Sequence, residues 1–168
     1  MPVINGNKNA NLLTGGAGDD LMRGRRGDDT LEGGLGADTL LGGRDDDLLI
    51  GGEGDDLLQG GSGDDTLIAG PGSDTLKGGS GADVFVVDAN SDQIVIKDFE
   101  DGVDKIDISA LNITPTAGAS GNDYWGYLAT QDGDTYLQFF DTSNGDMVAE
   151  VILEDFSFQN IDLGDYIL

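Results

Sequence analysis

Residues 33–68 read GGLGADTLL GGRDDDLLI GGEGDDLLQ GGSGDDTLI, four copies of one nine-residue pattern. The four nonamers belong to an uninterrupted series of nine that begins at Gly6 and ends at Val86. Position 6 is Asp in eight units and Asn11 in the first, position 8 is apolar in all nine, and position 4 is Gly in seven. A strict short period indicates a repeat architecture, in which each unit packs mainly on its neighbours.

Each position of the nonamer has a structural interpretation. Positions 7 to 9 predict a very short strand with the position-8 side chain on its inner face. Positions 1 to 6 predict a turn, because glycine permits positive φ and lets carbonyl groups converge. Each turn reverses the chain, so two consecutive nonamers form one coil around a thin apolar stack.

The acids of position 6 are therefore expected to stack on two edges of this roll. One edge holds Asp20, Asp38, Asp56 and Asp74, and the other holds Asn11, Asp29, Asp47, Asp65 and Asp83. Carboxylates ~4.8 Å apart repel by about 3 kcal/mol per pair at an effective dielectric constant of ~20. Several such pairs exceed the usual stability of a domain this size, ~5–15 kcal/mol, so a cation must separate them. Oxygen-only ligands with flexible geometry favour Ca²⁺ over Mg²⁺.

The composition excludes several classes of function. The 168 residues contain 33 acids, of which 28 are Asp, against 8 bases, giving a net charge of −25. This charge excludes an electrostatic nucleic-acid binder and disfavours binding to anionic membranes. The chain has no His or Cys, which excludes His-dependent triads, zinc sites with these ligands and disulfides. No apolar stretch is long enough to serve as a transmembrane segment, and the N-terminal stretch 1–20 lacks the apolar run of a cleaved signal peptide.

The nonamers resemble the GGxGxDxUx repeat of RTX (repeats-in-toxin) proteins, a calcium-binding repeat. The resemblance implies an all-β fold in which residues 1–86 form a parallel β-roll with Ca²⁺ between successive turns. Each edge has four Asp and three gaps, so roughly six central ions are expected. The implied carboxylate ligands are Asp20, Asp29, Asp38, Asp47, Asp56, Asp65, Asp74 and Asp83. The implied carbonyl donors are Gly16, Gly18, Gly27, Gly34, Gly36, Gly52, Gly54, Gly61, Gly63, Gly70, Gly72, Gly79 and Gly81.

Some units depart from the pattern. Arg25 replaces Gly at position 2 and Asp45 replaces Gly at position 4. Asp tolerates positive φ better than Arg does, so we expect strained or weakly occupied turns there. Asn9 and Asn11 indicate that the first unit is a degenerate cap. The position-5 acids are interpreted as outward solvated charge, with direct ligation as the alternative; they are Asp19, Asp28, Asp46, Asp55 and Asp64.

Residues 87–168 form a different, non-repeating and β-rich module. The segment FVVDANSDQIVIKDFEDGVDKIDISAL (85–111) alternates apolar and polar residues as half-buried strands do. It is similar to the segment that closes the β-roll in serralysin-like secreted proteases and in the R-modules of mannuronan C5-epimerases. Asp98, Asp101 and Asp104 are candidates for one more ion, with turn acids at a strand junction as an equal alternative.

An antiparallel β capping region is expected towards the C-terminus. Strands are predicted over 124–130, 135–140 and 147–154, with turns at 131–134 and 141–146. The aromatic residues of this region are expected in the core rather than on a sugar-stacking face; they are Tyr124, Trp125, Tyr127, Tyr136, Phe139 and Phe140. The final residues 165–168, DYIL, resemble the uncleaved C-terminal export signal of type I secretion substrates, an ordinary final strand being the alternative.

These observations predict a calcium-binding, non-catalytic module. Our hypothesis is that the chain stays largely unfolded inside a bacterial cell, leaves through the type I secretion machinery, and folds in extracellular Ca²⁺. It is expected to be either a small protein or the C-terminal domain of a secreted protease or lipase. A polysaccharide-binding (alginate-like) module is the alternative, although the sequence shows no basic strip. A hydrolase is disfavoured because the chain has no His and no nucleophile motif.

Overall fold

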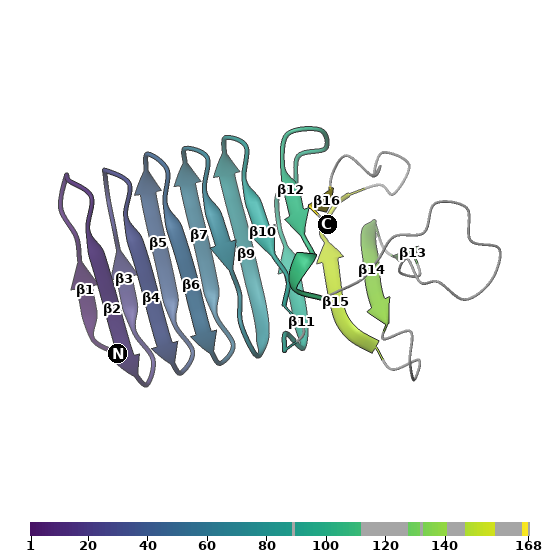
Figure 1. Ribbon diagram of the computed structural model, residues 1–168, viewed down its shortest axis with the longest axis horizontal. Coiled ribbons are helices and arrows are strands. Elements are labelled where there is room, and N and C mark those ends of the chain that lie inside the picture. The colour runs from purple at the N-terminus through teal and green to yellow at the C-terminus, as the bar shows by residue number, and fades with distance from the viewer. Residues whose placement is uncertain (89, 112–127, 132, 141–146, 157–165, 168) are drawn as a thin grey trace.

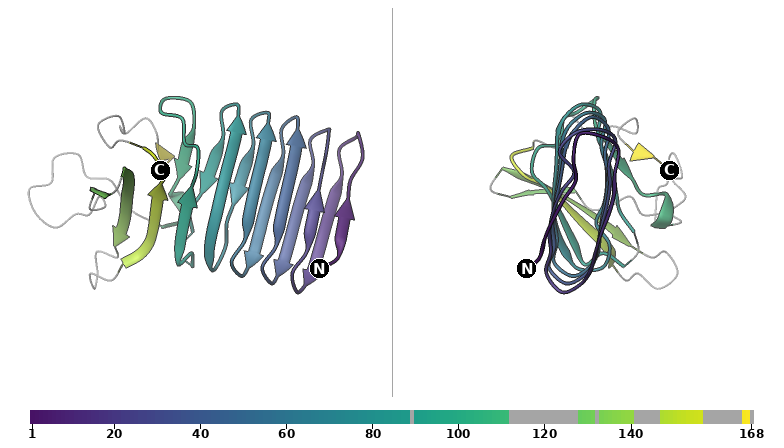
Figure 2. Two further views of the ribbon diagram at one scale, coloured as in Figure 1. Left: turned by 180° about the vertical axis from the view of Figure 1, so that it is seen from behind. Right: turned by 90° about the vertical axis from the view of Figure 1, so that its left-hand side faces the viewer.

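The chain coils into a flattened tube whose two broad walls are β-sheets that face each other (Figures 1 and 2). The computed structural model describes residues 1–88, 90–111, 128–131, 133–140, 147–156 and 166–167. Sheet A has the strand order β1 (Val3–Asn5), β3 (Leu21–Arg23), β5 (Thr39–Arg44), β7 (Leu57–Ser62), β9 (Ser73–Ser80), β11 (Gln93–Ile96), β15 (Met147–Leu153), β14 (Asp134–Phe140) and β13 (Leu128–Gln131). Sheet B has the order β16 (Tyr166–Ile167), β12 (Lys105–Asp107), β10 (Val84–Val86), β8 (Thr66–Ile68), β6 (Leu48–Glu53), β4 (Thr30–Leu35) and β2 (Leu12–Ala17).

Successive coils of the roll pair in parallel, and each residue lies beside its equivalent two nonamers along the chain. Leu31 lies beside Leu49 in sheet B, and Leu40 lies beside Leu58 in sheet A. This register confirms the coil of two nonamers and the parallel β-roll. A short 3₁₀ helix, η1 (Ser109–Leu111), follows β12. Within the described ranges, no helix is long and apolar enough to cross a membrane.

The strands of the roll are longer than positions 7 to 9. β4, β5, β6 and β7 each have six residues and continue through positions 1 to 3 of the next unit. Gly34 pairs with Gly52, and Gly43 pairs with Gly61. Because glycine has no Cβ atom, the backbones of neighbouring coils stay close enough at this position for strand pairing to continue. β3 and β8 have only three residues, and each precedes a unit in which Arg25 or Ala69 replaces a glycine.

The position-8 side chains form the core of the roll, as predicted. From Met22 through Phe85 they are fully buried, while Leu13 in the first coil is only partly covered. The core is one side chain thick in each strand. It therefore needs a neighbouring coil on both sides to exclude water.

Both sheets continue past the repeats into the C-terminal part. β11 pairs in parallel with β9, and β12 pairs in parallel with β10. β15 joins β11 in parallel, and β13, β14 and β15 then form the antiparallel end that the sequence predicted. The predicted strands over 135–140 and 147–154 correspond to β14 and β15. Of the strand expected over 124–130, residues 128–130 lie in β13, and residues 124–127 lie outside the described part of the chain.

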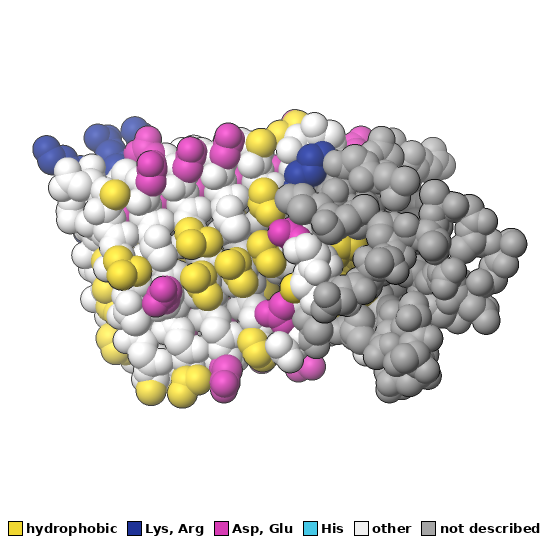
Figure 3. Space-filling model, in the orientation of Figure 1, with side chains coloured by type: hydrophobic (Ala, Val, Ile, Leu, Met, Phe, Trp, Pro, Cys, Tyr) yellow, Lys and Arg dark blue, Asp and Glu magenta, His cyan; other side chains and the backbone are white. Residues whose placement is uncertain are grey.

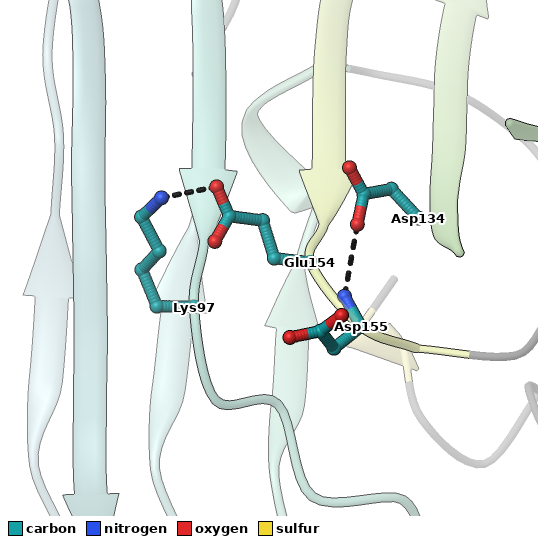
Figure 4. A network of polar contacts seen from close by, with 4 residues as sticks. All are labelled: Lys97, Asp134, Glu154 and Asp155. Atoms are coloured by element: carbon teal, nitrogen blue, oxygen red, sulfur yellow. Dashed lines mark hydrogen bonds and ion pairs between the residues drawn. The ribbon is translucent and has the colours of Figure 1, made fainter. Parts of the chain in front are cut away.

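Side-chain contacts join this end to the roll. The ring of Phe99 is buried, with its centroid 6.3 Å from that of Phe85 and 5.5 Å from that of Phe156. Lys97 forms an ion pair with Glu154 (Figure 4). Beside it, the Asp155 N–H donates a 2.9 Å hydrogen bond to Oδ1 of Asp134.

Several predictions for the C-terminal part have a definite place. Phe139 is 1% exposed and belongs to the core, as expected. Tyr166 and Ile167 form β16 beside β12, so a strand occupies part of the segment 165–168. Tyr124, Trp125, Tyr127 and the turn at 141–146 lie outside the described residues.

Candidate metal centre

The position-6 aspartates form two buried columns on the edges of the roll. All eight side chains are only 1–3% exposed. Six of them donate their backbone N–H to Oδ1 of the column aspartate eighteen residues later, as from Asp47 to Asp65 at 2.8 Å and from Asp38 to Asp56 at 2.8 Å. These bonds join the two series that the spacing of two nonamers predicts, and Asn11 begins one of them through a 2.7 Å bond to Asp29. Every column carboxylate except that of Asp20 thereby accepts a backbone N–H of the preceding coil.

The second oxygen of these carboxylates has no hydrogen-bond partner in the described residues. The orphaned buried atoms are Oδ2 of Asp29, Asp38, Asp47, Asp56, Asp65 and Asp74, and Oδ1 of Asp20. Asp20 differs because the residue one coil before it is Pro2, which has no N–H to donate. A buried anionic oxygen without a partner is costly, so these atoms indicate a missing cationic ligand.

Backbone carbonyls of positions 2 and 4 lie directly against the next coil. A Cβ atom added to Gly52 would be 2.1 Å from the Gly34 carbonyl oxygen, and one added to Gly72 would be 2.1 Å from that of Gly54. Both glycines have positive φ, of 108° and 138°. The glycines therefore leave space between coils in which only carbonyl oxygens and carboxylates meet.

Position-1 glycines also border the orphaned oxygens, and the sequence interpretation missed them. A Cβ at Gly33 would be 2.4 Å from Oδ2 of Asp38 and 2.5 Å from the carbonyl oxygen of Gly51. Position 1 is Gly in eight of nine units, and this recurrence is the sequence signal that could have predicted the close approach. The exception is Ala69, which is fully buried.

Burial raises the pKa of the column aspartates. Asp47, Asp65 and Asp74 have pKa values of about 7, and Asp56 and Asp83 of about 6, against an ordinary value of 3.8. Desolvation is the largest cause, and repulsion from neighbouring carboxylates adds to it. The hydrogen bond from the preceding coil opposes both effects. The columns thus hold charges that their surroundings do not neutralise.

The position-5 acids are exposed, which confirms that they point outward. They also form an outer ladder: Oδ1 of Asp64 accepts the N–H of Ala82 at 2.8 Å, one coil later. The two departing residues have positive φ, 91° at Arg25 and 73° at Asp45, confirming strained turns. Oδ2 of Asp45 accepts a 2.8 Å hydrogen bond from the Gly27 N–H, which compensates for the strain at Asp45.

For Asp98, Asp101 and Asp104, an ion site and turn acids at a strand junction are equal alternatives from the sequence, and among the described residues these three side chains do not gather as a metal-binding group. Asp104 instead extends one column, because its Oδ1 accepts the Asp83 N–H at 3.0 Å and its Oδ2 accepts that of Glu100 at 2.8 Å. The step from Asp83 to Asp104 is longer than two nonamers, and this irregular spacing hid the continuation in the sequence.

Three basic residues that are scattered in the sequence lie on one edge of the roll, and we call them the basic strip. Lys8, Arg26 and Arg44 share position 3 of alternate units, so each lies one coil from the next. Lys8 and Arg26 lie in the turns that follow β1 and β3, and Arg44 is the last residue of β5, on the same edge of the roll. The strip arises from coiling, so it is scattered in the linear sequence.

Comparisons with known proteins agree with this geometry. A family model described as the RTX calcium-binding nonapeptide repeat matches four times, over residues 3–31, 23–58, 32–67 and 59–94. No protein with a curated description matches the chain in sequence.

Solved structures with a similar fold include subunits of the mannuronan C5-epimerase of Azotobacter vinelandii. The R3 subunit has 27% identity and a TM-score of 0.51, and the match covers 96% of this chain and 80% of that one. The R2 subunit has 26% identity and a TM-score of 0.54, covering 93% and 91%. The extracellular lipase LipA of Serratia marcescens has 21% identity and a TM-score of 0.46, covering 100% of this chain and 40% of the lipase. With its repeats matched over more than half its length, this chain belongs to the RTX calcium-binding nonapeptide repeat family.

Proposed function

We propose that this chain is a non-catalytic module whose β-roll folds when Ca²⁺ binds between its coils. The observation that carries the proposal is the set of seven buried carboxylate oxygens without hydrogen-bond partners in the described residues. They stand in columns of like charge and cannot be solvated there. A divalent cation would remove both the repulsion and the missing contacts.

The expected ligands are the column aspartates together with the carbonyl oxygens of positions 2 and 4. These are hard oxygen donors on flexible turns, a set that suits Ca²⁺ better than the smaller and more strictly octahedral Mg²⁺. With three gaps between the four aspartates of each column, we expect roughly six ions. Glycine is needed at position 1 because a side chain there would occupy the space beside Oδ2 of a column aspartate.

The charge of −25 supports a chain that is unfolded where Ca²⁺ is scarce. Strong self-repulsion and a thin core disfavour compaction without the metal. RTX repeat proteins are typically secreted. We therefore place folding after export, with type I secretion as the route.

Calcium titration tests the proposal directly. Circular dichroism and calorimetry start in buffer stripped of calcium, and Ca²⁺ is then raised to ~10⁻³ M, the range of extracellular calcium modules. We expect β-structure to form with the binding heat, and Mg²⁺ at the same concentration to fail. A fully folded spectrum before calcium is added contradicts the proposal.

Polysaccharide binding is a second candidate function. The R3 and R2 subunits with a similar fold come from an enzyme named for mannuronan, an anionic polysaccharide. The basic strip on one edge removes the objection that the chain has no surface for an anionic ligand. Calorimetric titration with glycans in saturating Ca²⁺ separates this function from a purely structural calcium module.

A further inference from the structure

The strands of the two broad faces of the roll carry charges of opposite sign. In sheet A, the strands β1, β3, β5, β7 and β9 contain three basic residues, and their only acid, Asp74, is buried in a column. In sheet B, the strands β2, β4, β6, β8 and β10 contain Glu32 and Glu53 but no Lys or Arg. The other acids of the repeats lie in the turns and columns at the two edges, outside these strands.

The charges of both faces lie at position 9 of the nonamer and point outward. Because position 8 is buried in each strand, positions 7 and 9 lie on the outer face of the sheet. Arg23 on β3 is partly buried, Lys77 on β9 is exposed, and both hold position 9 of sheet A. Arg44 ends β5 beside the acids of the following turn, so the positive charge of this face rests on Arg23 and Lys77. On sheet B, Glu32 holds the same position of β4.

Both faces also present aliphatic side chains to the outside. Figure 3 shows the outer face of sheet B, where hydrophobic side chains gather across the middle of the roll with no Lys or Arg side chain among them. The outward aliphatic residues of this face are Leu12, Leu48, Ile50, Ile68, Val84 and Val86. Sheet A presents Leu21, Leu41 and Leu57, and Leu57 is 42% exposed. Each face therefore offers apolar area together with charge of one sign.

Sheet A has a shallow hollow with room for an aliphatic side chain. Leu41, Gln59, Gly43, Gly60 and Gly61 line it, on β5 and β7. The hollow exists because the glycines of position 2 present no side chain on the outer face. The isoleucines at position 9 of sheet B are side chains of the size that such a hollow accepts. The two faces therefore match in shape as well as in charge.

We propose that calcium-loaded rolls associate with one another, with the outer face of sheet A in one copy packed on the outer face of sheet B in the next. Contact between two like faces would bring Arg23 and Lys77, or Glu32, against the same residues of the second copy, so charge favours unlike faces. Because the two contacting faces differ, the assembly is open-ended rather than a closed dimer. The inference rests on the calcium-folded roll proposed above, because coiling creates both faces.

The size of the faces sets the strength of this association. Five strands ~4.8 Å apart, each about six residues long, give a face of about 24 by 20 Å. A contact between two such faces buries about 1,000 Å² in total, the lower limit for a specific interface. Figure 2 shows η1 projecting on the sheet B side at the C-terminal end, which confines the contact to β2 through β10. We therefore expect weak association that grows with protein concentration.

Sedimentation velocity of the full chain in saturating Ca²⁺, from ~1 μM to ~1 mM, tests the inference. The double variant Arg23→Glu/Lys77→Glu makes both faces acidic, and Glu32→Lys makes both basic. Each should weaken self-association at least about tenfold, although the first raises the net negative charge and the second lowers it. An equimolar mixture of the two variants should associate again, because their faces are complementary. Lys8→Glu/Arg26→Glu, with the same charge change as the first variant but in the turns, is the matched control and should associate as the unmodified chain does.

Several results would overturn the inference. A chain that remains monomeric at ~1 mM has no such contact, and a closed dimer that stops growing contradicts the packing of unlike faces. Equal losses in the matched control, or a mixture of variants that stays monomeric, would show that net charge rather than the two faces governs association. Circular dichroism precedes each run. A chain that folds in Ca²⁺ but does not associate overturns this inference alone, whereas a chain that does not fold overturns the proposed function as well.

Discussion

Six of the eight column aspartates use their two carboxylate oxygens differently. In Asp65, Oδ1 accepts the N–H of Asp47 at 2.8 Å, while Oδ2 has no partner in the described residues. The neighbouring Asp64 is exposed and accepts the N–H of Ala82 at 2.8 Å. Two adjacent acids thus make the same backbone contact, but only one carries a buried orphaned oxygen.

This contrast gives a matched pair of substitutions. We expect Asp65→Asn to remove about 1–3 kcal/mol of calcium-dependent stability, because the amide keeps the Oδ1 contact but loses the anionic Oδ2. Asp64→Asn should change it by less than about 0.5 kcal/mol. Urea unfolding in saturating Ca²⁺ measures both. Equal effects of the two substitutions would show that burial in the column is irrelevant to calcium.

The raised pKa values predict how pH affects the calcium-free roll. Asp65 and Asp74 have a pKa of about 7 in the fold and an ordinary value of 3.8 outside it, so folding takes up protons. Stability of the calcium-free roll is therefore greatest below pH ~4 and falls as the pH rises towards ~7. Circular dichroism across this range in calcium-stripped buffer, without a chelator, measures the effect.

The same protons compete with calcium. Calcium affinity should rise between pH ~5 and ~8 as the column aspartates ionise, and binding should release protons. Calorimetry in two buffers of different ionisation enthalpy measures the number of protons released when calcium binds. If the β-structure of the calcium-free chain increased with rising pH, the direction assigned to the pKa shifts would be wrong.

At the scale of the strands, position-2 glycines set how closely coils approach. The six-residue strands β4 and β6 remain paired at Gly34 and Gly52. A Cβ on Gly52 would meet the Gly34 carbonyl oxygen at 2.1 Å, whereas one on Gly16, at the same position of the first full coil, meets nothing within 4 Å. Both have positive φ, so they differ mainly in the neighbouring coil.

Gly16→Ala should therefore cost about 1–2 kcal/mol, from backbone strain alone. Gly52→Ala should cost more, by about 1–3 kcal/mol, because the coils must also separate. Urea unfolding in saturating Ca²⁺ compares the two variants. Similar losses of stability in the two variants would mean that the space beside the Gly34 carbonyl oxygen tolerates a methyl group.

At the scale of the whole molecule, the roll depends on a cover at its C-terminal end. β11 and β12 pair with β9 and β10, and Phe99 packs on Phe85. We propose residues 1–86 as the roll and 87–168 as its cap. Without the cap, the last coil would expose the core side chains Leu76 and Phe85.

Truncation after Val86 should raise the Ca²⁺ concentration needed for folding or abolish folding. Calcium titration followed by circular dichroism, alongside the full chain, measures the shift. Adding residues 87–111, which contain β11, β12 and Phe99, should restore part of the loss. A truncated roll that folds at the same Ca²⁺ concentration as the full chain would contradict the capping role.

The coil of two nonamers, the buried leucine stack and the two columns of aspartates could all be predicted from the amino-acid sequence. These follow from one local pattern repeated in register, since identical short units pack only on their neighbours. The continuation of a column by Asp104 and the longer strands could not be predicted. They depend on irregular spacing and on inter-coil distances that only the fold sets.

The contacts of each carboxylate oxygen and the positions of the basic side chains could be seen only in the folded chain. Lys8, Arg26 and Arg44 become neighbours because coils stack, although two nonamers of sequence separate each from the next. The orphaned oxygens become visible only when every backbone donor has been assigned, including the one that Pro2 lacks. A repeat fixes which residue types recur, whereas hydrogen-bond satisfaction and surface charge depend on which coil lies beside which.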